Sequence, residues 1–115
     1  MILKTKGTAK IVEFPPEVKG VTMWELITDR DGAPNFQLRE VKIESGMLSP
    51  KHSHDWEHEL YVLEGEGTCT TGNHETPMKP GDAILIPPGE HHFIRAGKKG
   101  VRFICCIPVA KVCQI

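Results

Sequence analysis

Histidines in two segments of the chain have the types and spacing of a metal site. His52 and His54 are two residues apart, so on extended backbone both imidazoles point to one face. His58 follows at the mouth of an apolar run, and a fourth candidate, His92, lies in the distant segment 81–92. Neutral imidazole is a common metal ligand, and one short bend lets the first three converge. A chance cluster of surface polar residues is the alternative, but the spacing favours metal binding.

Alternation along the next expected strand selects His58 as a ligand. On a strand over 58–64, His58 shares its face with Leu60 and Val62, whereas Glu59 lies on the opposite face. We therefore expect His58 to point toward the metal and Glu59 to point away from it, unless the strand carries a bulge.

A later strand, expected over 91–95, begins with two adjacent histidines. His92 has the parity of the apolar Ile94, so we predict that His92 points inward and that His91 points outward. His74 stands alone at an expected hairpin tip and is predicted to be exposed.

Arg39 and Cys105 are candidates for a role beside the metal. On a strand over 36–44, Arg39 shares a face with the apolar Val41, and an inward guanidinium needs a partner. Such a residue is either an anchor for a substrate anion or part of a structural salt bridge, and an outward position after a register shift is a further alternative. Cys105 faces the same interior from a strand over 101–107, either near the metal or as a small core residue.

Apolar residues on the opposite face of these strands predict a homodimer. Tyr61, Leu63, Ile104 and Cys106 are too apolar for a solvent-facing surface, and a strand sandwich must cover its edges. Trp56 lies between two of the histidines. It is interpreted as a lid, a dimer contact or a packing residue.

Composition limits the class of protein. The 115 residues fit one domain, 1–115, and 14 Lys plus Arg balance 15 Asp plus Glu, which predicts no nucleic-acid partner. The four cysteines form no C-x-x-C pair, and the first residues lack the apolar core of a signal peptide. No apolar run has the length of a membrane span. We expect a reduced cytoplasmic protein without a membrane partner.

The pattern of short apolar runs predicts an all-β fold. Eleven glycines and nine prolines fall between these runs, and long segments with helical period are absent. We expect turns at 64–67 and 97–100. The expected strands cover 8–14, 21–28, 36–44, 58–64, 68–71, 75–79, 82–86, 91–95 and 101–107.

The two histidine segments resemble the paired motifs of the cupin superfamily. Two departures from the family pattern occur, because His58 stands at the family's glutamate position and Ala96 replaces its asparagine. The matching positions are Gly46, His52 and His54 in the first motif, and Gly81, Pro87, Gly89 and His92 in the second.

The histidine at position 58 makes the chain similar to small single-domain cupins of thermophilic bacteria that hold manganese with four histidines. This resemblance implies a double-stranded β-helix, the cupin jelly-roll barrel, usually assembled as a dimer. It implies Arg39 and Cys105 in the cavity and four metal ligands at His52, His54, His58 and His92. Manganese is implied by the resemblance, whereas imidazole affinity alone favours nickel, copper or zinc, and iron is the next candidate.

Two classes of function follow from such a site. Four neutral imidazoles leave the full 2+ charge of the ion, which lowers the pKa of bound water and raises the reduction potential. A six-coordinate ion keeps two positions for a substrate or for dioxygen. We therefore predict a metal-dependent oxygenase acting on a small organic substrate. The alternative is a non-catalytic module that binds a small anionic ligand, because the fold does not determine the function.

Overall fold

The computed structural model describes residues 1–51 and 53–109, and it consists mostly of antiparallel strands. The helical segments in these ranges are two 3-10 turns of three residues, η1 (Lys6–Thr8) and η2 (Asp29–Asp31), and neither has the length of a membrane span. The strands are β1 (Lys10–Ile11), β2 (Val21–Ile27), β3 (Phe36–Ile43), β4 (His58–Thr71), β5 (His74–Met78), β6 (Ala83–Ile86) and β7 (His92–Pro108).

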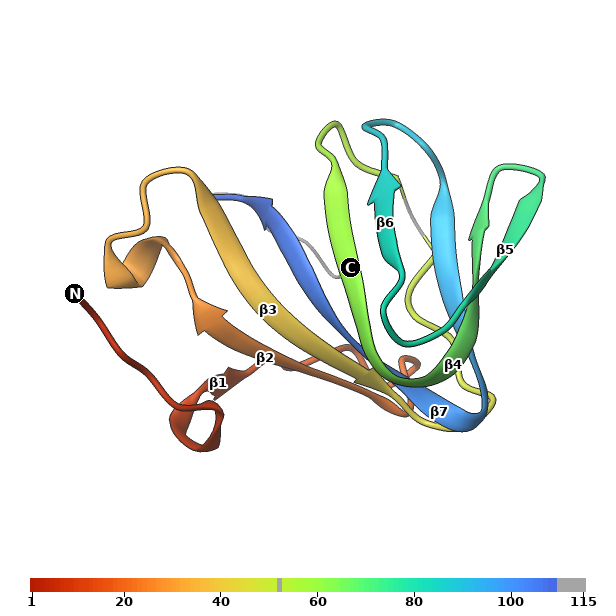
Figure 1. Cartoon of the computed structure of the whole chain (residues 1–115), viewed down its shortest axis with the longest axis horizontal. Coiled ribbons are helices and arrows are strands. Elements are labelled where there is room, and N and C mark those ends of the chain that lie inside the picture. The colour runs from red at the N-terminus through yellow and green to blue at the C-terminus, as the bar shows by residue number, and fades with distance from the viewer. Residues whose placement is uncertain (52, 110–115) are drawn as a thin grey trace.

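Strands β4 and β7 form the long central ribbon of the fold. The strand order is β1-β2-β3-β7-β4-β5, and β6 pairs with the beginning of β4. The second half of β7 lies between β3 and the first half of β4, whereas its first half pairs with the second half of β4. The ribbon bends, so that two groups of strands diverge from a shared base (Figure 1). This arrangement confirms the predicted double-stranded β-helix.

Glycines lie at the bend of the ribbon. The β4–β7 register shifts on either side of Gly65, which has a φ of 80°. A Cβ added to Gly65 would lie no more than 3.0 Å from backbone atoms of Gly100 and of the residue after it. The predicted turns at 64–67 and 97–100 are therefore wrong. These residues continue both strands through irregular pairing, because glycine permits a bulge as readily as a turn.

The first predicted strand, over 8–14, is also wrong in its extent. Its first residue, Thr8, belongs to η1, and regular pairing is limited to β1, where Lys10 lies opposite Glu25. The ladder ends soon afterwards, since the consecutive prolines at 15 and 16 have no N–H to donate.

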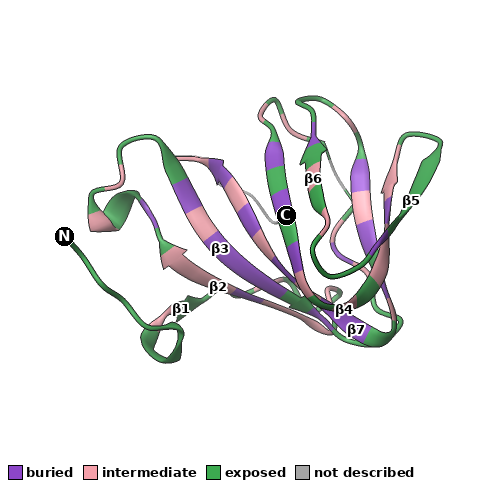
Figure 2. Cartoon of the chain, in the orientation of Figure 1, coloured by how far each residue is buried: buried purple, intermediate pink, exposed green. Residues whose placement is uncertain are grey.

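Buried residues alternate with more exposed ones along much of β3, β4 and β7 (Figure 2). This is the two-residue period of strands with one face in the core. The buried apolar set is Met23, Val41, Ile43, Leu60, Val62, Cys69, Met78, Ile86, Ile94, Ala96, Val101, Phe103, Cys105 and Ile107. The histidines and the arginine described below share the inner face with this set.

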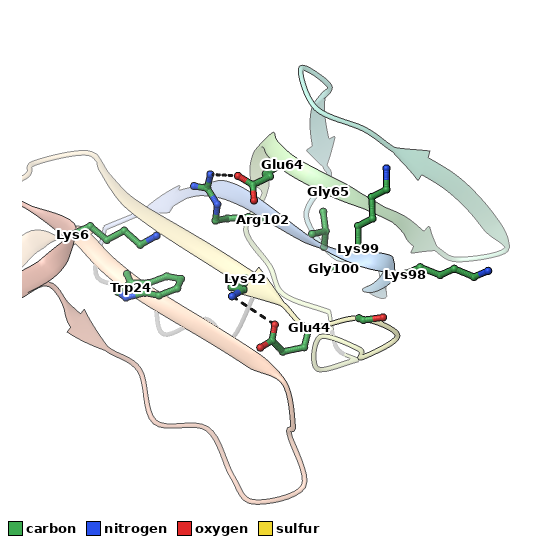
Figure 3. Close-up of a pocket in the computed structure, with 12 residues that line it drawn as sticks. Lys6, Trp24, Lys42, Glu44, Glu64, Gly65, Lys98, Lys99, Gly100 and Arg102 are labelled. Atoms are coloured by element: carbon green, nitrogen blue, oxygen red, sulfur yellow. Dashed lines mark hydrogen bonds and ion pairs between the residues drawn. The ribbon is translucent and has the colours of Figure 1, made fainter.

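Ion pairs cover part of the outer face, around a groove of about 560 Å³ (Figure 3). Glu40 accepts hydrogen bonds from Lys6 and Arg102, and Arg102 also binds Glu64 at 3.0 Å. The ammonium of Lys6 lies 4.1 Å from the centroid of the Trp24 ring. These contacts hold the N-terminal segment against β2 and β3, and they pair Lys6 and Arg102 with carboxylates.

Candidate metal centre

Three histidines meet inside the barrel. One ring nitrogen from each of His54, His58 and His92 can be chosen so that all three lie within 4.8 Å of one another, so the group could hold a metal ion. The ring centroids are 5.2 Å apart for His54 and His58, 5.6 Å for His54 and His92, and 4.9 Å for His58 and His92. His58 and His92 are almost fully buried, at 0% and 1% exposure. The fourth predicted ligand, His52, lies outside the described residues.

The bend of the central ribbon brings His58 and His92 together. His58 begins β4, and His92 lies opposite Thr71 at the other end of the same strand. A straight strand would separate the two ends of β4 by about 40 Å, at about 3.3 Å per residue. The folded ribbon instead puts the two imidazoles in contact. The backbone N–H of Gly89 donates to the carbonyl of His54 and ties the third histidine to the turn before β7.

Hydrogen bonding and stacking orient the imidazoles. His92 Nδ1 lies 3.0 Å from the carbonyl oxygen of Glu90. A carbonyl only accepts, so this nitrogen carries the proton, and the lone pair of Nε2 is left available for a metal. The ring of His54 stacks on Trp56 with 4.4 Å between centroids and 6° between planes. Trp56 also packs against the core cluster, which favours its interpretation as a packing residue.

Arg39 and Cys105 lie on the inner face, next to the histidines. Arg39 is 3% exposed and Cys105 is fully buried, so the outward position considered for Arg39 is wrong. Nη2 of Arg39 donates to the Cys105 sulfur at 2.9 Å. The same sulfur lies 3.4 Å from Nδ1 of His58. Sequence parity predicted that Arg39 and Cys105 point inward, but not that they contact each other or that Cys105 contacts His58.

The remaining polar candidates lie outside this cluster. Glu59 and His91 are exposed, as alternation predicted, and His74 is exposed, as its place at a hairpin tip predicted. Ser49, which sequence reasoning missed, is buried, and its hydroxyl accepts from the backbone N–H of Ile94 at 2.7 Å. The carbonyl of Glu90 was also missed, since a backbone acceptor has no signature in the sequence.

The donor set fits a first-row divalent ion. Imidazole nitrogen is a common ligand for zinc, copper, iron and nickel. The three described histidines contribute no charge when neutral. Cys69, Cys105 and Cys106 are free cysteines, so no disulfide among them competes for the sulfur beside His58.

Comparisons with known proteins agree with this fold. The family model described as "Cupin domain" matches residues 39–107, which include the three described histidines. The structure of the polyketide cyclase RemF from Streptomyces resistomycificus superposes with a TM-score of 0.84 and 34% identity. The match covers 94% of this chain and 79% of that one.

Two curated relatives match over a shorter stretch. An uncharacterized protein of Methanocaldococcus jannaschii is 35% identical over 71 residues, covering 60% of this chain and 57% of that protein. The oxalate-binding protein of Thermotoga maritima is 32% identical over 69 residues, covering 58% of this chain and 57% of the relative. The matched region therefore spans little more than half of either relative.

Proposed function

This chain belongs to the cupin family, and we propose that it is a metal-dependent enzyme of the oxygenase type, acting on a small organic substrate with dioxygen. The observation that carries the proposal is the meeting of three imidazoles next to a buried guanidinium. His54, His58 and His92 offer nitrogen ligands within 4.8 Å of one another. Arg39 lies against Cys105, which in turn contacts His58.

We propose that one divalent ion binds per chain and that His52 completes a set of four ligands. Manganese is our first candidate because of the resemblance to four-histidine manganese cupins, followed by iron and then nickel, zinc or copper. A bound ion would polarise the oxygens that coordinate it. The chain's own part is to hold neutral ligands in fixed tautomers and to exclude water from the buried faces of His58 and His92.

The substrate class that we propose is a small molecule that presents two oxygens to the ion and carries negative charge. The names of two relatives refer to oxalate and to polyketides. Oxalate has two adjacent carboxylates, and polyketides have alternating carbonyls that form enolates, so both can chelate a metal. We assign a catalytic role to Arg39, as a fixed positive charge beside this substrate, and a supporting role to Cys105, whose sulfur contacts His58.

Oxygen uptake after anaerobic metal loading tests the enzyme proposal. The purified chain is loaded with manganese or iron and mixed with acetylacetone, a small enolisable diketone, before air is admitted. Oxygen consumption that requires both metal and diketone supports the oxygenase. Turnover without oxygen would refute the oxygenase class in favour of a redox-neutral reaction, the direction that the polyketide cyclase relative suggests.

The second candidate is a non-catalytic module that binds a small anion, favoured by the relative named as oxalate-binding. It predicts that oxalate raises the melting temperature of the metal-loaded protein and is not consumed. An oxalate-dependent rise that disappears in metal-free protein, together with no turnover of any chelating substrate, would establish this candidate.

Alanine variants test the ligand set. Replacing His54, His58 or His92 should weaken metal binding strongly, whereas His74→Ala and His91→Ala serve as exposed controls with unchanged affinity. Binding should also weaken as the pH falls through about 6.5, where free imidazole becomes protonated and competes with the metal. Equal losses in all five variants would contradict the assignment.

We further propose that the protein forms a homodimer and works in the reducing cytoplasm. The outer face of β4 and β6 carries exposed apolar side chains, with Tyr61 50% and Leu85 63% exposed. Side chains of this kind favour burial against a second copy.

A further inference from the structure

Strand register lines up three inner-face residues beside the metal centre. Arg39 on β3 lies directly opposite Cys105 on β7. On its other side, Cys105 lies opposite Leu60 of β4. His58 precedes Leu60 by two residues, so it is the diagonal neighbour of Cys105 on the same face. The order across the sheet is therefore guanidinium, sulfur, imidazole.

The contacts along this row have a defined direction at one end. Nη2 of Arg39 lies 2.9 Å from the sulfur of Cys105. Guanidinium has only N–H donors, so the sulfur must be the acceptor. The contact between the sulfur and His58 Nδ1, at 3.4 Å, can run either way, since a thiol both donates and accepts.

Metal binding by His58 requires one of the two directions of the hydrogen bond between its Nδ1 and the Cys105 sulfur. If the thiol donated to Nδ1, the neutral ring would carry its proton on Nε2, and that nitrogen could not bind an ion. If Nδ1 donates to the sulfur, the lone pair of Nε2 is available to the cluster. His92 shows the second arrangement, because its Nδ1 can only donate to the carbonyl of Glu90, 3.0 Å away.

We propose that Cys105 is a positioning residue that accepts a hydrogen bond from His58 Nδ1 and thereby presents Nε2 of His58 to the metal. Arg39 assists by fixing the sulfur between two donors. Cys105 thus has the part that a carboxylate or a backbone carbonyl usually has behind a metal-binding histidine. This inference rests on the metal site proposed above, but it assigns the role to a residue that does not itself bind the ion.

The test of this role compares metal affinity in three variants. Cys105→Ala removes the acceptor and should weaken binding about 10–100-fold, the usual effect of losing such a partner. Cys105→Ser restores an oxygen acceptor and should recover most of the affinity. Cys69→Ala removes another buried sulfur, on β4, and should leave affinity unchanged. Equal affinity in Cys105→Ala and wild type would overturn the proposal, as would a loss in Cys69→Ala that matches it.

Nitrogen NMR of His58 separates this inference from the proposed function. In metal-free protein at a pH where the ring is neutral, we expect the proton on Nδ1 in wild type and in Cys105→Ser. Cys105→Ala should move it, wholly or partly, to Nε2. A wild type with Nε2 protonated would refute the positioning role even if metal binds. The expected tautomers in a protein that binds no metal would support the hydrogen bond while refuting the proposed metal centre.

Discussion

A comparison of Gly65→Ala with Gly72→Ala should distinguish the contribution of Gly65 to the bend of the central ribbon from the ordinary cost of a left-handed backbone. Gly65 has a φ of 80°, and an added Cβ would lie no more than 3.0 Å from backbone atoms of Gly100 and Val101. Gly72, at the tip between β4 and β5, has a φ of 56°, but its Cβ would meet nothing within 4 Å. Gly72→Ala is therefore a matched control, with the same chemical change and left-handed backbone but no close approach.

The two substitutions should differ by a few kcal/mol in the free energy of unfolding. A left-handed alanine costs roughly 1–2 kcal/mol, which applies to both positions. At Gly65 the new methyl group also forces the carbonyl of Gly100 away. A backbone group left without its partner costs about 1–3 kcal/mol more. We expect losses of about 1–2 kcal/mol for Gly72→Ala and about 2–5 kcal/mol for Gly65→Ala.

Equilibrium urea denaturation of the metal-free proteins measures this difference. Small domains have total stabilities of about 5–15 kcal/mol, so Gly65→Ala should remain folded enough to assay. Its metal affinity should also fall, because the bend brings His58 and His92 together, whereas Gly72→Ala should bind normally. Equal destabilisation by the two changes, or normal metal binding by a destabilised Gly65→Ala, would refute this account of the bend.

Three further predictions concern the surroundings of the site. Trp56 stacks on His54, and a Trp24→Phe variant makes its fluorescence emission observable alone. This emission should fall when manganese binds, and the manganese concentration at half of the change should equal the one found by direct metal analysis. Burial raises the pKa of the Cys69 thiol from 9.0 to about 11, so its contribution to the stability of the fold is fully present below pH 9. That contribution is lost as the pH rises toward 11, and the urea midpoint of the wild type should fall over this range. The midpoint should fall less steeply in Cys69→Ala, which lacks the thiol. Light scattering should give a dimer, and Tyr61→Glu should shift it to a monomer.

The direction in which each side chain points was the feature of the site that the sequence predicted best, through alternation along the strands. His58 is buried and the next residue, Glu59, is exposed; His92 is buried and His91 is exposed. A two-residue period forces such choices once the apolar neighbours show which face is inside. The same argument put Arg39 on the inner face, where 3% of it is exposed. Its contact with sulfur depends on the register between β3 and β7, which the sequence alone did not provide.

The bend of the ribbon could not be predicted from the alternation of residues. Glycine-rich residues at 64–67 and 97–100 predicted turns, and each expected turn divided a strand that is continuous in the structure. Glycine permits either a turn or a continued strand, so pairing with the neighbouring strand determines which of the two forms. The two glycine-rich stretches lie beside each other in the β4–β7 ribbon, where a Cβ on Gly65 would meet the backbone of Gly100 and a Cβ on Gly97 would meet the side chain of Glu66.

The candidate metal centre depends on both the alternation of side chains and the bend of the ribbon. Alternation turns His58 and His92 inward, but they begin two different strands and meet only because the ribbon folds over. An ion held by both would fasten the two arms of the ribbon to each other. Because such an ion binds the folded chain better than the unfolded one, it stabilises the fold by about 2.7 kcal/mol at a free concentration 100 times its Kd. The bend that creates the site is thus also the feature of the fold that the metal would stabilise.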